Sequence, residues 1–219
     1  MINLVIAPHP DDEVLGLGGT IFKKKSKGEK FGVIYVTSMF PSKSWNKKKI
    51  NQRDKEINKV CKFFKFDFVS KLNFPTTKLD QVKRQELVKK IDNEIKKYKP
   101  QTIFVPNPGD SHSDHKIVFE AASSCSKSFR NKFVKKWLCY EVLSETEQGL
   151  NNDFFPNYYI SLEKNHIQKK ILAMKIYKSE NGNFPFPRSK ESILSLAKFR
   201  GTTIDSKFAE AFLLKKLID

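Results

Sequence analysis

Cysteine is scarce in this 219-residue chain, and long apolar runs are missing. The three cysteines, Cys61, Cys125 and Cys139, are widely spaced and form no Cys-x-x-Cys pair. This pattern argues against a disulfide framework and a thiolate zinc site, and it favours a reducing cytoplasm. No apolar run approaches the roughly 20 residues that cross a bilayer. The segment before Pro8 lacks the basic and apolar regions of a secretory signal, so we expect a soluble, unprocessed, cytoplasmic protein.

Acidic residues are outnumbered, with 24 Asp and Glu against 41 Lys and Arg, which gives a formal net charge of +17. Such an excess favours anionic partners: nucleic acid, phosphorylated small molecules or an acidic membrane surface. A nucleic-acid-binding module would gather its lysines on one face with interleaved aromatic residues. Here the lysines are dispersed over nearly every segment, and no helix-turn-helix or zinc-finger signature is present. We therefore rank nucleic acid far below a small-molecule substrate.

Hydrophobic residues make up 39% of the chain, enough for one substantial core, and no linker divides it, so we expect one domain over residues 1–219. Strands that alternate with helices predict an α/β, Rossmann-like fold, with a largely parallel sheet covered by helices on both faces. The predicted strands are Leu4–Ala7, Phe31–Thr37, Phe66–Phe74, Gln101–Val105, Trp137–Leu143 and Tyr158–Leu162. The predicted helices are Val14–Lys27, Ile50–Phe64, Leu79–Tyr98, Ser113–Cys125, Glu163–Tyr177, Ser189–Phe199 and Ser206–Leu217.

A dense polar cluster, His9-Pro10-Asp11-Asp12-Glu13, follows the first predicted strand. Three adjacent carboxylates repel one another, so such a cluster at a strand end indicates a bound cation or a proton-transfer role. The alternative is an acidic turn that stabilises the dipole of the following helix. Ligands of open α/β sheets bind at the carboxyl ends of strands, which favours the chemical interpretation.

A second polar cluster follows the predicted strand Gln101–Val105 and contains Asp110, His112, Asp114 and His115. Three of the chain's four histidines therefore follow two predicted strands. Two histidines three residues apart at a helix start, with Asp110 and Asp114 able to orient them, match the pattern of metal ligands supported by carboxylates.

Together the two clusters supply a metal-ligand set: His9, Asp12 and either His112 or His115. Two nitrogens and one oxygen suit zinc with an open position, and zinc lowers the pKa of a bound water to about 7, which predicts hydrolysis. Two histidines and a carboxylate also suit Fe²⁺, so a non-heme iron oxygenase is an alternative.

On these motifs the sequence resembles the LmbE-like, or PIG-L-type, zinc-dependent N-deacetylases. The two motifs stand here as Ala7-Pro8-His9-Pro10-Asp11-Asp12-Glu13 and His112-Ser113-Asp114-His115. Weaker correspondences are Gly18-Gly19-Thr20, Arg53 with Glu56, Tyr177 with Ser179, Phe199-Arg200-Gly201, and Ala209-Glu210-Ala211-Phe212. The resemblance thus covers most of the chain.

The resemblance implies that His9, Asp12 and His115 bind one zinc ion per chain and that Asp11 is general base and then general acid. The implied reaction hydrolyses the N-acetyl group of an amino sugar or sugar conjugate, giving acetate and a free amine. Whether that sugar carries a phosphate or a nucleotide, and whether the chain forms a homo-oligomer, stay open at this stage.

The resemblance also implies that His112, held by Asp114, is an imidazolium that stabilises the oxyanion. We further expect Arg53 and Asp110 to contact the substrate, with pairing of Arg53 to a nearby acid such as Asp54 as the alternative. Two departures from the family pattern are notable. A Leu-Pro-Asp-Gly-like turn of many members is Phe74-Pro75-Thr76-Thr77 here, so a substrate-facing acid is missing, and Ser113 replaces a proline.

Overall fold

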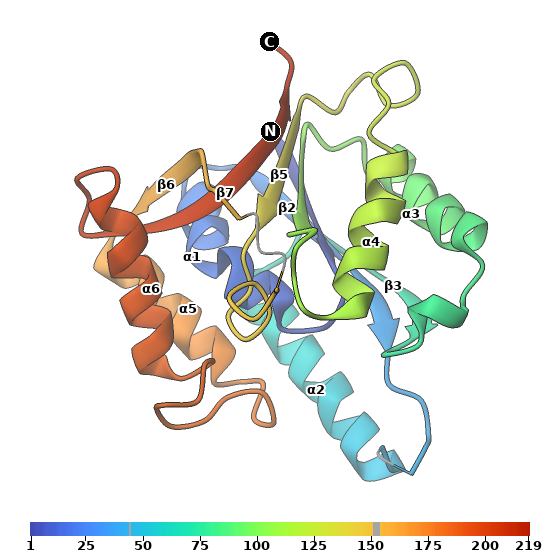
Figure 1. Ribbon diagram of the computed structural model, residues 1–219, viewed down its shortest axis with the longest axis horizontal. Coiled ribbons are helices and arrows are strands. Elements are labelled where there is room, and N and C mark those ends of the chain that lie inside the picture. Colours follow the sequence, from blue (N-terminus) through green and yellow to red (C-terminus); the bar gives the residue numbers. More distant parts are fainter. Residues whose placement is uncertain (44, 151–153) are drawn as a thin grey trace.

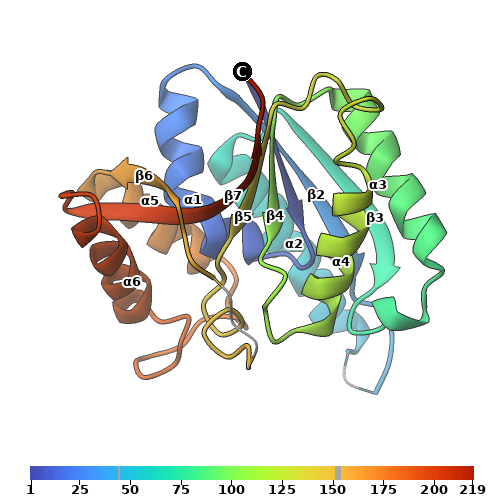
Figure 2. The ribbon, with the colours of Figure 1, turned by 45° about the horizontal axis from the view of Figure 1, so that its top comes forward.

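A seven-stranded sheet forms the centre of the molecule, with helices on both faces (Figure 1, Figure 2). The computed structural model describes residues 1–43, 45–150 and 154–219. The strand order is β3-β2-β1-β4-β5-β7-β6, in which β3 through β5 are parallel neighbours and β7 runs antiparallel to β5 and β6. The strands are β1 (Ile2–Ala7), β2 (Lys30–Ser38), β3 (Phe68–Pro75), β4 (Thr102–Pro106), β5 (Lys136–Tyr140), β6 (Tyr158–Leu162) and β7 (Phe208–Leu217).

The helices divide the core into two apolar layers, one on each face of the sheet. One layer packs beneath α1, α2, α5 and α6, and the other beneath α3 and α4. The helices are α1 (Asp12–Ser26), α2 (Lys47–Phe64), α3 (Arg84–Tyr98), α4 (Ser113–Ser124), α5 (Lys164–Met174) and α6 (Lys190–Thr202), with a short 3₁₀ turn at Leu79–Gln81. The predicted α/β fold with a largely parallel sheet is therefore confirmed.

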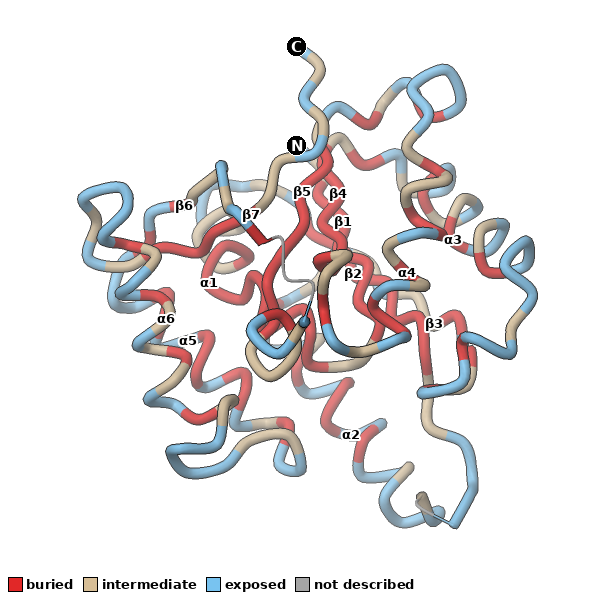
Figure 3. Tube along the Cα trace, viewed as in Figure 1, coloured by how far each residue is buried: buried red, intermediate tan, exposed pale blue. Residues whose placement is uncertain are grey.

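Strand β1 lies between β2 and β4, and its residues Leu4 to Ala7 are fully buried (Figure 3). Helices cover both faces of this part of the sheet, so the side chains of these four residues face protein. That environment explains why Leu4 to Ala7 form a continuous apolar run without alternation.

The C-terminal segment corrects the sequence-based prediction. Residues Ser206–Leu217 are predicted as a helix, but Phe208–Leu217 forms strand β7. Its alanine, glutamate, leucine and lysine residues favour a helix locally. Hydrogen bonding to a strand on each side outweighs that preference, because β7 closes the gap between β5 and β6. The prediction also starts α3 too early, since Leu79 lies in the 3₁₀ turn.

Helix α1 is broken at Leu17, whose φ of −150° and ψ of 24° are not helical. The break frees backbone groups inside the protein, and a buried ion pair between Lys170 and Glu210 satisfies them. Lys170 Nζ donates to the Leu15 carbonyl at 2.7 Å and to Glu210 Oε1 at 2.6 Å. Both carboxylate oxygens of Glu210 accept backbone N–H groups of residues 19 and 20. This pair joins α1 to α5 and β7.

Among the described residues, none of the helices has both the length and the apolar character needed to cross a bilayer.

Candidate active site

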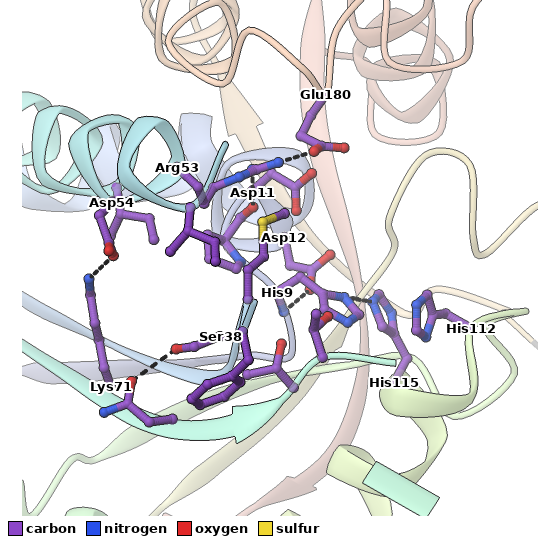
Figure 4. A pocket seen from close by; sticks show the side chains of 18 of the residues that line it. His9, Asp11, Asp12, Ser38, Arg53, Asp54, Lys71, His112, His115 and Glu180 are labelled. Atoms are coloured by element: carbon purple, nitrogen blue, oxygen red, sulfur yellow. Dashed lines mark hydrogen bonds and ion pairs between the residues drawn. The ribbon is translucent and has the colours of Figure 1, made fainter. Parts of the chain in front are cut away.

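The loops that follow β1 and β4 meet at one edge of the sheet, because the two strands are adjacent and parallel. The loop after β1 is fixed from β2: the Pro8 carbonyl accepts bonds from the Thr37 N–H at 3.0 Å and from Thr37 Oγ1 at 2.8 Å. Beside these loops lies a cavity of about 550 Å³, lined in part by His9, Asp12 and His115 (Figure 4). The two polar clusters predicted from the sequence therefore form one site.

His9, Asp12 and His115 present three ligand atoms to one another. His115 Nε2 lies 3.3 Å from His9 Nδ1 and 3.3 Å from Asp12 Oδ2, and His9 Nδ1 lies 3.6 Å from Asp12 Oδ2. Tetrahedral ligands at the usual zinc distances of about 2.0–2.1 Å are separated from one another by roughly 3.3 Å. The triangle of donor atoms therefore fits a divalent cation at its centre.

Two further carboxylates orient the two imidazoles. Asp110 Oδ2 lies 2.7 Å from His115 Nδ1, and Asp114 Oδ2 lies 3.1 Å from His9 Nε2. Each carboxylate engages one ring nitrogen and leaves the other, His115 Nε2 or His9 Nδ1, directed at the shared point. Carboxylates that hold the second nitrogen of a metal-binding histidine fix its tautomer and ring orientation.

The charge around these histidines also suits a cation. Burial alone would lower the pKa of His9, but hydrogen bonds to Asp114 and Asp12 raise it to about 9. Burial likewise opposes protonation of His115, while Asp12 and Asp110 raise the pKa of that imidazole to about 10. The carboxylates therefore concentrate negative potential at this point, as a divalent-cation site requires.

The side chains of Asp110 and Asp114 make contacts other than those predicted from the sequence. Asp110 is fully buried and does not line the cavity, because its carboxylate accepts from Thr146 Oγ1 at 2.6 Å as well as bonding His115. In this structure Asp110 therefore supports His115 and does not face the cavity. The Asp114 carboxylate contacts His9 rather than His112, and the backbone N–H of Asp114 donates to His112 Nδ1 at 3.0 Å. His112 is thus held at the start of α4 by the backbone.

A second group of residues, His9, His112 and Asp114, also brings ligand atoms close enough together to hold a metal ion. Its Asp114 carboxylate and His112 Nδ1 already accept backbone N–H groups of the protein. The Asp114 carboxylate accepts backbone N–H groups of Thr77 at 2.7 Å and of Leu79 at 3.3 Å. The geometry therefore favours the group that contains Asp12.

Asp11 lies beside this site with a strained backbone. Its φ of 131° is rare for a residue with a side chain, and it caps α1, whose first turn donates to the Asp11 carbonyl. Burial and the charge of Asp12 raise the pKa of Asp11 to about 8, although Arg188 opposes this rise. Arg188 Nη1 donates to Asp11 Oδ2 at 2.9 Å. The carboxyl lines the cavity next to the metal-ligand triangle.

Lys71 on β3 lines the cavity and was not singled out in the sequence. Three charged residues in the loops around the cavity were not singled out either: Glu145, Glu180 and Arg188. Glu145 follows β5, and the other two lie in the loop between α5 and α6. Each of these three is a single charged residue in an irregular segment, so no sequence motif indicated a role for it. Arg53, which was expected at the substrate, does line the cavity, and its side chain pairs with Glu180 (Figure 4).

Residues 4–126 match the family model described as PIG-L, GlcNAc-PI de-N-acetylase. The chain belongs to this family. A diacetylchitobiose deacetylase from Thermococcus kodakarensis is 23% identical over 94% of this chain and 80% of its own length. Both loops that build the site lie within the matched segment, and the chain is a hydrolase of the N-deacetylase class.

Solved structures of the same fold cover nearly the whole chain. The conserved protein TT1542 from Thermus thermophilus has a TM-score of 0.79 and 24% identity, covering 99% of this chain and 96% of its own. The N,N'-diacetylchitobiose deacetylase from Pyrococcus horikoshii has a TM-score of 0.74 and 22% identity, covering 98% of this chain and 84% of its own. Both structures therefore share the fold of this chain over nearly its whole length.

Proposed function

We propose that this PIG-L family member hydrolyses the N-acetyl group of an amino sugar, using a divalent metal held by His9, Asp12 and His115. The observation that carries the proposal is the triangle of donor atoms, with separations of 3.3, 3.3 and 3.6 Å. Two nitrogens and one carboxylate oxygen suit zinc, and Fe²⁺ is the alternative. When bound there, the cation would polarise the acyl carbonyl and lower the pKa of water.

Asp11 is the proposed general base and general acid. Its carboxyl lines the cavity beside the metal-ligand triangle, and its raised pKa, about 8, suits a group that both takes and returns a proton near neutral pH. Asp11 would accept a proton from the attacking water while the new carbon–oxygen bond forms. It would then pass the proton to the nitrogen as the carbon–nitrogen bond breaks, giving acetate and an amine.

His112 is the proposed donor to the oxygen of the acyl group. Its Nδ1 accepts the Asp114 N–H, so a neutral ring carries its proton on Nε2. Burial lowers the pKa of His112, and the nearby imidazoles of His9 and His115 add to this effect. We therefore propose a neutral imidazole that donates from Nε2, in place of an imidazolium held by the Asp114 carboxylate. Asp114 serves instead to position His9.

The rest of the cavity has the chemistry of a sugar site. The hydroxyls of Ser38 and Thr76 and the amide of Asn73 line it, along with Met39 and Phe40. Hydroxyl and amide groups bond sugar hydroxyls, while apolar side chains cover ring faces. The names of the relatives, which include diacetylchitobiose deacetylases, support an acetylated sugar as the substrate.

The test combines metal analysis with an assay for primary amine release from N-acetylglucosamine and its oligosaccharides. We expect about one equivalent of zinc per chain and acetate formed in equal amount to amine. His9→Ala should lose both metal and activity, whereas Asp11→Asn should keep the metal and lose activity. His166→Gln is the matched control, because His166 lies on α5 outside the cavity. Full metal content in His9→Ala would disprove the ligand assignment.

A further inference from the structure

The cavity does not share the strong positive charge of the whole chain. Five acidic side chains line it, those of Asp11, Asp12, Asp54, Glu145 and Glu180, and all but Asp11, whose pKa is about 8, count as negative charges near neutral pH. Three arginine or lysine side chains line it, those of Arg53, Lys71 and Arg188. Within the described part of the chain, each of these three cations is already paired with a carboxylate. The net charge of +17 is therefore not a reason to expect a phosphate in this cavity.

Arg53 is held from several sides. It is only 7% exposed, and its Nη2 bonds Ser179 Oγ at 3.0 Å and the Glu180 carboxylate. Its Nη1 donates to the Pro10 carbonyl at 3.2 Å, in the loop that carries His9. An anionic ligand could bind this guanidinium only by displacing Glu180.

Arg188 is bound by the same glutamate. Its Nη1 donates to Glu180 Oε2 at 2.7 Å and to Asp11 Oδ2 at 2.9 Å, and its Nη2 lies 3.8 Å from Glu145 Oε1. One oxygen of Glu180 thus engages Arg53 and the other engages Arg188. Burial would raise the pKa of Glu180, but the charges of the two arginines outweigh this and lower it, so the carboxyl is ionised near neutral pH.

The third cation lies further from the metal-ligand triangle. Lys71 Nζ on β3 donates to Asp54 Oδ1 on α2 at 2.9 Å (Figure 4). The Asp54 side chain is 55% exposed, so this pair is hydrated and contributes little to selectivity. The buried pairs around Glu180 are the ones that determine which charges the inner cavity accepts.

We propose that Glu180 is a specificity-determining residue, which occupies both Arg53 and Arg188 and makes the cavity select an acetamido sugar without a phosphate or carboxylate on the ring. This inference rests on the proposed deacetylase function and goes beyond it by naming the charge of the substrate. A ring phosphate would have to displace Glu180 from two guanidinium groups or lie next to the carboxylates of Glu145 and Glu180. Like charges in a desolvated site are strongly disfavoured, and such repulsion is a common means of rejecting a competitor.

The test compares N-acetylglucosamine with its 6-phosphate, both as substrates and as ligands in titration calorimetry. For the unaltered protein we expect kcat/KM and binding affinity to favour the neutral sugar by at least about tenfold, because like-charge contacts oppose the phosphate. Glu180→Gln should reduce that preference by about tenfold, because it releases a positive charge next to the ring. Asp54→Asn is the matched control, and it should leave the preference within about twofold, because its pair with Lys71 is hydrated.

A preference of the unaltered protein for the phosphate would overturn the inference, and so would a Glu180→Gln variant with unchanged preference. The first of these results would mean that Glu180 moves aside and that the two arginines form an anion site. Absence of amine release from either sugar would instead contradict the proposed function. Calorimetry needs no turnover, so it still decides the inference in that case.

Discussion

Asp114 Oδ2 lies 3.1 Å from Nε2 of His9, a residue 105 positions earlier in the chain. The same oxygen accepts the backbone N–H of Thr77 at 2.7 Å. One carboxylate thus connects the loops after β1 and β3 with the start of α4. The orientation of a proposed metal ligand therefore depends on three separate segments of the sheet edge.

Removing the other orienting carboxylate tests whether such support matters for metal binding. Asp110→Asn should weaken metal affinity by about 10- to 100-fold, because the amide no longer provides a charged acceptor for His115 Nδ1. Chelator competition measures the affinity. Thr146→Val is the control, since it removes a neutral partner of Asp110, together with an acceptor for the Val142 N–H, and leaves the carboxylate in place. Equal affinities in Asp110→Asn and the unaltered protein would show that the carboxylate is not needed.

His112 should act on catalysis without holding the metal. His112→Ala is expected to lower kcat by about 10²–10³-fold, the usual loss when one oxyanion donor is removed. The metal content should stay unchanged, because His112 is outside the triangle of donor atoms. Steady-state kinetics and metal analysis on the same preparation check both statements. A variant that loses its metal would place His112 among the ligands.

The buried pair of Lys170 and Glu210 should be important for stability. Lys170→Met is expected to lower the free energy of unfolding by about 3–5 kcal/mol, because it leaves the Glu210 charge buried without its partner. Urea denaturation measures the change. Lys169→Met on the neighbouring, exposed position of α5 is the control and should change the free energy by about 0.5 kcal/mol or less. A small loss in Lys170→Met would mean that the carboxyl is not charged.

Asp67 should make stability depend on pH in the acidic range. Burial would raise its pKa, but bonds from Lys25 and from the Phe31 N–H outweigh this and lower it. A carboxyl with a lowered folded-state pKa stabilises the fold above its unfolded pKa, about 3.9, and that contribution is lost as pH falls through the folded value. The stability difference between the unaltered protein and Asp67→Asn should therefore be constant near pH 7 and shrink below about pH 4. A difference that grows on acidification would contradict this sign.

Much of the fold was predictable because its signals are local. Strand β1 is a short apolar run that ends in a polar cluster, and the sheet topology then brings His9 and His115 together. Strand β7 was not predictable in this way. Its residues favour a helix, and only its position between two other strands makes it extended.

The site residues that stand in sequence motifs could be predicted. Contacts between residues far apart in the chain could not. The motifs indicated His9, Asp12 and one of two histidines, and only the resemblance to the family selected His115; the structure brings His9, Asp12 and His115 together. The hydrogen-bond partners of the Asp114 carboxylate could not be predicted, because a carboxylate at the start of a helix can point to either side of that helix. Glu180 lies in a loop, and nothing in its local sequence indicates that it bonds two arginines from different segments.

The break in α1 affects which shortened fragments of the protein can form the proposed site. The family match ends at residue 126, and a fragment ending there would keep both motif loops. It would lack Lys170 and Glu210, which complete the interrupted turn just after the acidic motif. Such a fragment would hold every proposed ligand but lack the contacts that fix this turn, so we expect the part of the chain after residue 126 to be needed for the proposed site although it supplies no metal ligand.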